Sequence, residues 1–133
     1  MTNMIKSLLP YLLVGIGGFL GANTRFVLAS WTNQLFGPLF PYGTFLVNIS
    51  GSFVLGFLLP LLQAGIVPHG RPMIYLLCIG FLGSYTTFST FEYETRSLFD
   101  EGSWLLAMIN VFGSFFVGLL AVHVGIGLSR RWL

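Results

Sequence analysis

The chain has 133 residues, of which 55% are hydrophobic and only 8% are charged, and its net charge is +2. A soluble domain carries about 25% charged residues, so four acidic and six basic side chains cannot cover a soluble globule of this size. The composition predicts that lipid surrounds most of the chain, and the small, scattered positive charge does not indicate a nucleic-acid partner.

Four apolar segments are each long enough for the roughly 20 residues that a bilayer crossing needs. The first is predicted to run over residues 8–30, with Ser7 as its N-cap and with Gly37 and Pro38 opposing its continuation. Lys6 precedes it, as a cation does in a signal peptide. Because the apolar stretch continues without a clear cleavage site, we expect a retained first helix.

The other crossings are predicted at 44–64, 72–98 and 103–128, and Pro72 suits the first turn of the third. No hydrophilic domain or linker remains, so residues 1–133 are expected to form a single all-α membrane domain with both termini on one side. Basic residues number four on that side (Lys6, Arg71, Arg130, Arg131) and two on the other (Arg25, Arg96), which favours cytoplasmic termini by a margin small enough to permit both orientations.

The third segment contains the most informative stretch, GSYTTFSTF at residues 83–91. From Met73 to Gly83 there is only about 16 Å of helix, so the crossing must continue through this polar stretch. Gly83 and Ser84 weaken the helix, and the hydroxyls that follow compete for backbone hydrogen bonds. We therefore predict a break near 83–86, where irregular backbone must be buried or line a cavity, and where freed carbonyls commonly hold a cation.

Two segments carry a polar stripe whose members recur every four residues and therefore share one helix face. Such a stripe favours close helix packing, and neutral donors with almost no carboxylates also suit an anion path. From the residues alone both interpretations stay open. The stripes are Thr44, Asn48, Ser52 and Gly56 in the second segment, and Asn110, Ser114 and Gly118 in the fourth.

Two more pairs are candidates for packing or for a site. Gly17 and Gly21 are spaced for close helix packing, and Arg25 continues their face, where it either snorkels to the interface or supplies positive potential to an aqueous mouth. Phe88 and Phe91 share a face just beyond the predicted break. They pack against lipid or core, or they present their electropositive ring edges to a small anion.

Three sequence blocks resemble the CrcB/Fluc family of small fluoride channels: GGFLGANTRF at 17–26, YGTFLVNISGSFVLG at 42–56 and GFLGSYTTFSTFEYE at 80–94. The resemblance extends over nearly the whole chain, and the fourth segment matches more loosely. It implies an antiparallel, dual-topology homodimer with two fluoride pores and a structural sodium ion at its centre. It also implies passive export of cytoplasmic fluoride through the plasma membrane, which relieves fluoride toxicity.

The resemblance also assigns residues. The backbone carbonyls of Gly83 and Thr86 would hold the sodium ion, and Asn48, Phe88 and Phe91 would contact fluoride. The remaining residues would form a polar track, with a cation at the vestibule. These are Ser89, Thr90, Asn110 and Ser114 for the track, and Arg25 for the vestibule.

Other functions stay open as alternatives. A proton-coupled exporter of the small multidrug type needs an intramembrane carboxylate, and a nonconducting membrane assembly protein would use the polar stripes only for packing. The sequence offers no nucleophile beside a base, no phosphate loop and no paired catalytic carboxylates, so we do not expect an enzyme. The acids are all expected toward the loop between the third and fourth segments: Glu92, Glu94, Asp100 and Glu101. Of these, Glu92 and Glu94 are expected to face water or to cap a charge.

Overall fold

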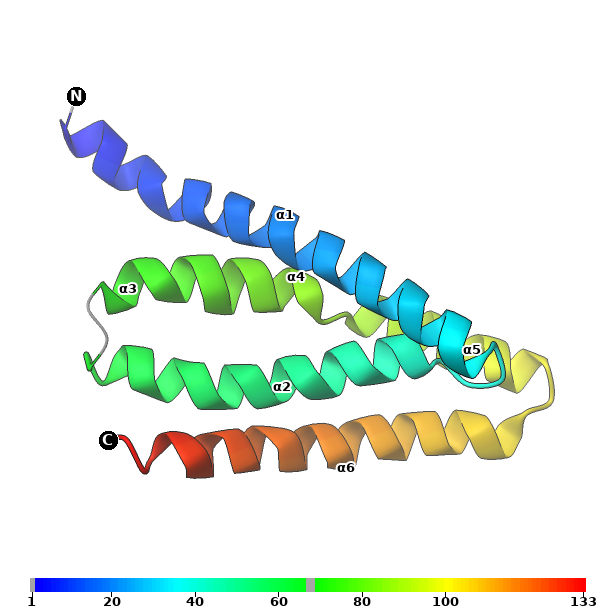
Figure 1. Cartoon of the computed structure of the whole chain (residues 1–133). Helices are drawn as coiled ribbons and strands as arrows, with labels where there is room; N and C mark the ends of the chain where they lie inside the picture. The colour runs from blue at the N-terminus through cyan, green and yellow to red at the C-terminus, as the bar shows by residue number, and fades with distance from the viewer. Residues whose placement is uncertain (1, 67–68) are drawn as a thin grey trace.

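The computed structural model describes residues 2–66 and 69–133, and over these ranges it is helical throughout. Four helical stretches are long and apolar enough to cross a membrane, as the sequence predicts. The start of the first and the end of the last lie at the same end of the bundle (Figure 1). The four stretches are Ser7–Phe36, Tyr42–Gln63, Gly70–Asp100 and Trp104–Ser129.

Helix α1 (Thr2–Phe36) is longer than the predicted 8–30. The prediction that Ser7 is an N-cap is wrong, because the helix runs through it. Its polar side chains do not end the helix either, because they bond to the preceding turn: Asn23 Nδ2 donates to the Phe19 carbonyl at 2.7 Å and Thr24 Oγ1 to the Leu20 carbonyl at 2.8 Å. The helix ends where Gly37 takes a φ of 80°, a conformation that suits glycine.

Helices α2 (Tyr42–Gln63) and α6 (Trp104–Ser129) begin and end within two residues of the predicted bounds and pack along each other. Small residues bring the two backbones together. A Cβ on Gly56 would meet the Val122 carbonyl oxygen, and one on Gly125 would meet the Phe53 carbonyl oxygen. This close packing is the role that small residues have between membrane helices.

The third crossing (Gly70–Asp100) consists of four pieces: α3 (Gly70–Met73), the π-helix η1 (Ile74–Leu82), α4 (Gly83–Tyr85) and α5 (Phe88–Asp100). The π-helix has no counterpart in the sequence prediction. The break lies at Thr86 and Thr87, at the C-terminal edge of the predicted window, and Gly83 itself stays helical with φ −63° and ψ −30°. Glycine weakens a helix without ending it, whereas Thr86 turns to an extended ψ of 155°.

Helix α1 lies across η1 and α4, and the third crossing runs between the α2–α3 connection and the α5–α6 connection at opposite ends (Figure 1). The predicted close packing at Gly17 and Gly21 is confirmed, since a Cβ there would overlap the carbonyl oxygens of Leu76 and Phe81. A buried cluster of Val47, Leu82 and Tyr85 lies beside the break, so the core of the subunit supports the interrupted region.

Candidate functional site

A cavity of about 300 Å³ lies at the break, and α2 and the third crossing form its walls. It brings together four residues that the sequence assigns to the site: Asn48, Gly83, Thr86 and Phe88. The remaining described lining residues are Gly51, Ser52, Leu55, Cys78, Leu82 and Thr87. All of these lining side chains are uncharged. We call this space the break cavity.

Asn48 holds the extended peptide at the break. Its Nδ2 donates to the Thr87 carbonyl at 3.0 Å, and its Oδ1 accepts from the Thr87 N–H at 2.8 Å. The amide therefore pairs with Thr87 as a neighbouring strand would, and it satisfies two backbone groups that the break leaves without helical partners. The second N–H of Asn48 has no protein partner in the described part of the chain, and it stays available at the cavity wall.

The break frees backbone carbonyls on its upstream side. In a continuous α-helix the Thr87 N–H would donate to the Gly83 carbonyl, but it donates to Asn48. The Thr90 N–H would donate to the Thr86 carbonyl, but it donates to Thr87 Oγ1 at 3.4 Å. The carbonyls from 83 to 86 are thus the last of the upstream helix and are available as cation ligands. No group of three or more His, Cys, Asp or Glu side chains suited to a metal occurs within residues 2–66 and 69–133.

Upstream of the break the cavity meets the C-terminal carbonyls of a helix, whereas downstream of it lies the N-terminus of the next helix, α5. Thr87 is the N-cap of α5, with its side chain accepting from the Thr90 N–H, and the first amides of α5 begin at Phe88. A helix N-terminus carries partial positive charge and a C-terminus partial negative charge. The break therefore places a negative helix end and a positive helix end next to each other, beside one cavity.

Phe88 and Phe91 lie one turn apart at the start of α5. Their ring centroids are 6.0 Å apart and the ring planes are tilted by 40°. Phe91 is half-buried, while Phe88 lines the cavity and is 74% exposed. The pair is therefore adjacent, as the spacing predicts, and one of its rings lies on the surface of the single chain.

The α6 stripe lies outside the break cavity; its first member, Asn110, bonds to α5, and its last, Gly118, lies against Ile49 of α2. Asn110 is 1% exposed and donates to Thr95 Oγ1 at 2.8 Å, Ser114 Oγ donates to Asn110 Oδ1 at 3.5 Å, and Thr95 Oγ1 donates to the Phe91 carbonyl at 2.7 Å. Thr95 is not among the residues that the sequence pattern predicts for the site, because no local signal separates it from other threonines. Three further candidates also lie outside the cavity lining: Ser89 and Thr90 are exposed on α5, and Arg25 is partly exposed on α1.

Glu94 corrects the expectation that the acids near the end of the third crossing face water or cap a charge. Thr44 Oγ1 donates to its Oε1 at 2.9 Å, and its Oε2 is buried without a partner among the described residues. It lines a second cavity of about 320 Å³ at the end of the bundle, where the α1–α2 connection approaches α5. Thr44, the first residue of the α2 stripe, therefore bonds to a carboxylate that lies 50 residues further along the chain.

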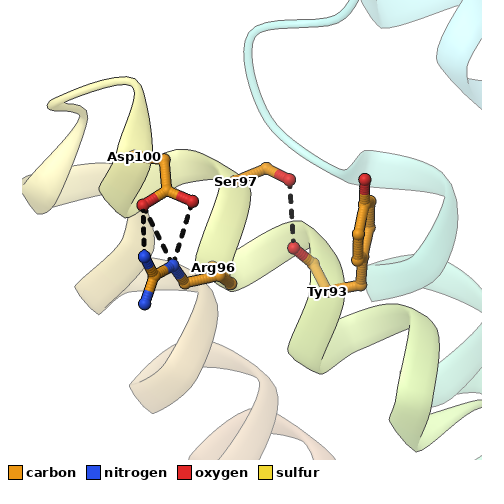
Figure 2. A network of polar contacts seen from close by, with 4 residues as sticks. All are labelled: Tyr93, Arg96, Ser97 and Asp100. Atoms are coloured by element: carbon orange, nitrogen blue, oxygen red, sulfur yellow. Dashed lines mark hydrogen bonds and ion pairs between the residues drawn. The ribbon is translucent and has the colours of Figure 1, made fainter.

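Other polar groups of α5 bond within the helix. Arg96 forms an ion pair with Asp100 at 2.8 Å, and Ser97 Oγ donates to the Tyr93 carbonyl at 3.1 Å (Figure 2). Both contacts join residues four apart on one helix. The Arg96 and Asp100 side chains are 76% and 58% exposed. This part of α5 therefore contributes no charge to the break cavity.

The sequence is similar to one protein family and to several proteins of known name. The family model described as CrcB-like protein, Camphor Resistance (CrcB), matches residues 12–126. A fluoride-specific ion channel FluC of Chloroflexus aurantiacus is 42% identical over 119 residues, which cover 90% of this chain and 94% of the relative. Proteins with the same name are 41% identical over 123 residues in Solibacter usitatus (92% and 100% covered) and 44% identical over 116 residues in Dehalococcoides mccartyi (86% and 87% covered). The family match includes both sides of the break.

Proposed function

The chain belongs to the CrcB family, and from that membership we propose that it is a channel that passes fluoride across the plasma membrane. It is a multi-pass membrane protein, and its family is one of channels and not of enzymes. The observation in the structure that supports the proposal best is the break cavity. There an uncharged wall, the N-terminus of α5 and the Phe88 ring meet halfway along the third crossing.

The cavity wall suits weak binding of a small anion. The first amides of α5, the second N–H of Asn48 and the ring edge of Phe88 offer partial positive charge, and no cationic side chain is among the described lining residues. Donors of this kind replace the water of a strongly hydrated anion, while the absence of a full positive charge lets the ion leave again. A negative-inside membrane potential favours exit of an intracellular anion by about 2.3 kcal/mol per 100 mV.

We propose that a second copy of the chain, in antiparallel orientation, completes the pathway. The rim of the cavity supports this, because Phe88 is 74% exposed and Gly83 is exposed within one subunit. The bias of four to two in basic residues permits insertion in both orientations. A dual-topology dimer would cover the open side of each cavity and give two pores.

The residues at the break fit a structural sodium ion. The carbonyls of Gly83 and Thr86 have both lost their α-helical donors, to Asn48 and to the Thr87 hydroxyl. These two carbonyls from each of two subunits would hold the ion. When bound, a sodium ion would neutralise the facing carbonyl dipoles. Oxygen ligands of this kind, at freed helix ends, hold sodium in broken-helix membrane proteins.

One observation favours a second candidate, the proton-coupled exporter. Glu94 is a partly buried carboxylate of the third crossing with one unpartnered oxygen, and such groups mark proton pathways in membrane proteins. The position of Glu94, in a separate cavity at the end of the bundle, is less suited to alternating access than a site at the midplane.

Efflux from liposomes separates these functions. The purified protein is reconstituted in liposomes, and the release of fluoride and of chloride is followed with ion-selective electrodes, with and without a proton gradient. We expect fast fluoride release, negligible chloride release and no need for a proton gradient. Release that requires the gradient and disappears in Glu94→Gln, but not in the control Glu92→Gln, would instead support the exporter. No release of either anion would support the assembly protein.

A further inference from the structure

A partly buried hydroxyl pair lies one residue upstream of the break. Tyr85, the last residue of α4, is 6% exposed, and its Oη is 2.8 Å from Ser50 Oγ on α2. Ser50 Oγ also lies 2.7 Å from the Leu46 carbonyl, which can only accept. Ser50 Oγ also lies 3.3 Å from the Val47 carbonyl, and because these two carbonyls compete for the single serine proton, the geometry favours Tyr85 as the donor in the pair.

The pair is part of a three-residue contact between α2 and the break. Ser50 bonds to Tyr85, Gly51 lies against Thr86, and Asn48 bonds to the backbone of Thr87. A Cβ on Gly51 would overlap Thr86 Cγ2 and would lie 3.1 Å from the Tyr85 ring. One turn of α2 therefore contacts three consecutive residues at the point where the third crossing changes from helix to extended backbone.

The Tyr85 ring alone would fill this part of the core. It stacks on Phe81 at 5.8 Å between centroids, with ring planes 14° apart, and it packs with Val47 and Leu82. The hydroxyl also fixes the orientation of the Tyr85 side chain relative to Ser50, because a hydrogen bond is directional and apolar packing is not. Neither Ser50 nor Tyr85 lines the break cavity, so any effect on an ion must pass through the residues that do.

We propose that Tyr85 and Ser50 are positioning residues for fluoride conduction. Their hydrogen bond fixes the end of α4, and thereby the angle at which the Thr86 carbonyl and the N-terminus of α5 face the break cavity. This role presupposes the proposed function. Without the bond, Tyr85 is held against α2 by apolar contacts alone, and the two bonds between Asn48 and Thr87 remain as the polar anchor of the break. The end of α4 can then tilt relative to Asn48 and the start of α5.

The variant Tyr85→Phe tests the role with little structural disturbance. It keeps the ring, and Ser50 Oγ stays bonded to the Leu46 carbonyl, so no buried group is left without a partner. We expect the initial rate of fluoride efflux from liposomes to fall about fivefold, as loss of one hydrogen bond allows, and the ratio of fluoride to chloride efflux to fall with it. The control Tyr93→Phe, at a side chain that is 75% exposed on α5, keeps the wild-type rate and ratio.

Ser50 variants separate positioning from stability. Ser50→Ala leaves the buried Tyr85 hydroxyl without a partner, so it lowers the melting temperature more than Tyr85→Phe does. A positioning role predicts the same loss of flux in both single variants and no further loss in the double variant, because all three lack one and the same bond. Ser50→Thr, which keeps the hydroxyl, retains the flux.

Hydrogen exchange gives a readout that does not depend on transport. In Tyr85→Phe the backbone amides of residues 86–90 should exchange faster while those of α6 do not change. Wild-type flux together with wild-type exchange at 86–90 in Tyr85→Phe would overturn the proposal, and so would a flux that only follows the melting temperature across the variants. If the wild-type protein passes no fluoride, the proposed function fails. The exchange result then still decides whether the hydroxyl pair fixes the break.

Discussion

Through η1 the third crossing is fixed to α1 by backbone contact, and from Tyr85 onward it is fixed to α2 and α6 by side-chain hydrogen bonds. Upstream, η1 lies against α1 at glycines, where a Cβ would overlap backbone atoms of the other helix. Downstream, polar side chains join the break and α5 to α2 and α6, through two hydrogen bonds at Thr87 and one each at Glu94 and Thr95. The glycines are Gly17, Gly21 and Gly80, and the bonds are Asn48 to Thr87, Thr44 to Glu94 and Asn110 to Thr95.

The difference separates a region that maintains the fold, η1 against α1, from a region that we expect to act on the ion, the break and α5. Backbone contact over a long interface tolerates no added atom and has one geometry. Hydrogen bonds from individual side chains fix a segment one group at a time, and each of them can be removed without filling or emptying the core. We therefore expect upstream substitutions to act on folding and substitutions at the break to act on ion flux.

The largest effect is expected from Gly17→Ala. Its Cβ would overlap the Leu76 carbonyl oxygen, and backbone on both sides prevents relief by a side-chain rotation. The cost should be about 3 kcal/mol, at the upper end for overpacking, and little monodisperse protein should elute on size exclusion. Gly15→Ala is the matched control, because no described atom lies within 4 Å of its Cβ position. Equal yield and melting temperature for the two variants would contradict the close contact between α1 and η1.

Asn48→Ala should abolish most of the flux while the protein still folds. It leaves the N–H and C=O of Thr87 without partners at the break and removes a donor from the cavity wall. We expect fluoride efflux to fall more than about tenfold, because a lost bidentate contact leaves two polar groups unpaired. Ser52→Ala is the control: it lies one turn further on the same face, lines the same cavity and makes no hydrogen bond to a described residue, and its flux should stay within about twofold of wild type. Similar fluxes in both variants would rule out a special role for Asn48.

Phe88→Ile and Phe91→Ile should reduce flux with a smaller effect than Asn48→Ala. Each replaces a ring edge by an aliphatic group of similar apolar character, so the interaction with an anion is lost and the packing is largely kept. We expect about a fivefold loss of fluoride efflux, at the scale of an aromatic contact, with an unchanged elution volume on size exclusion. Phe112→Ile on α6, at a ring that is 50% exposed, serves as control. Undiminished flux in both test variants would remove the ring-edge role.

The smallest effect is expected from Arg96→Gln. Its ion pair with Asp100 is exposed and local to α5, and exposed pairs contribute little. Fluoride efflux and melting temperature should match those of the wild type. A clear loss of flux would show that the charge of Arg96 affects the ion pathway, and that residues outside the break cavity contribute to conduction.

The sequence predicts the fold class because membrane crossings depend on length and hydropathy, which are local properties. It also predicts an interrupted third crossing, since the apolar run from Met73 to Gly83 is too short to span, and the spacing of Phe88 and Phe91 places them together after the break. Asn48 was singled out by its stripe on α2, and it reaches the break in the folded chain.

What the sequence did not predict depends on contacts between distant segments. The position of the break at Thr86 and Thr87 follows from Asn48, which lies 39 residues earlier and takes the Thr87 N–H. The partly buried state of Glu94 depends on Thr44, and the Tyr85 hydroxyl depends on Ser50, 35 residues away. The extension of α1 beyond residue 30 has a local cause, because Thr32 Oγ1 donates to the Leu28 carbonyl within the helix and the helix ends only at Gly37, with its positive φ.

The zero-current potential in a planar bilayer tests most directly the claim that the break forms a selective, passive fluoride path. The purified protein is incorporated with unequal fluoride concentrations on the two sides and equal chloride and pH. We predict that the zero-current potential follows the fluoride gradient, at about 59 mV per tenfold ratio for a monovalent ion, and that the current falls more than about tenfold in Asn48→Ala. A potential that stays at zero, or one that follows an imposed chloride or proton gradient, would contradict the account.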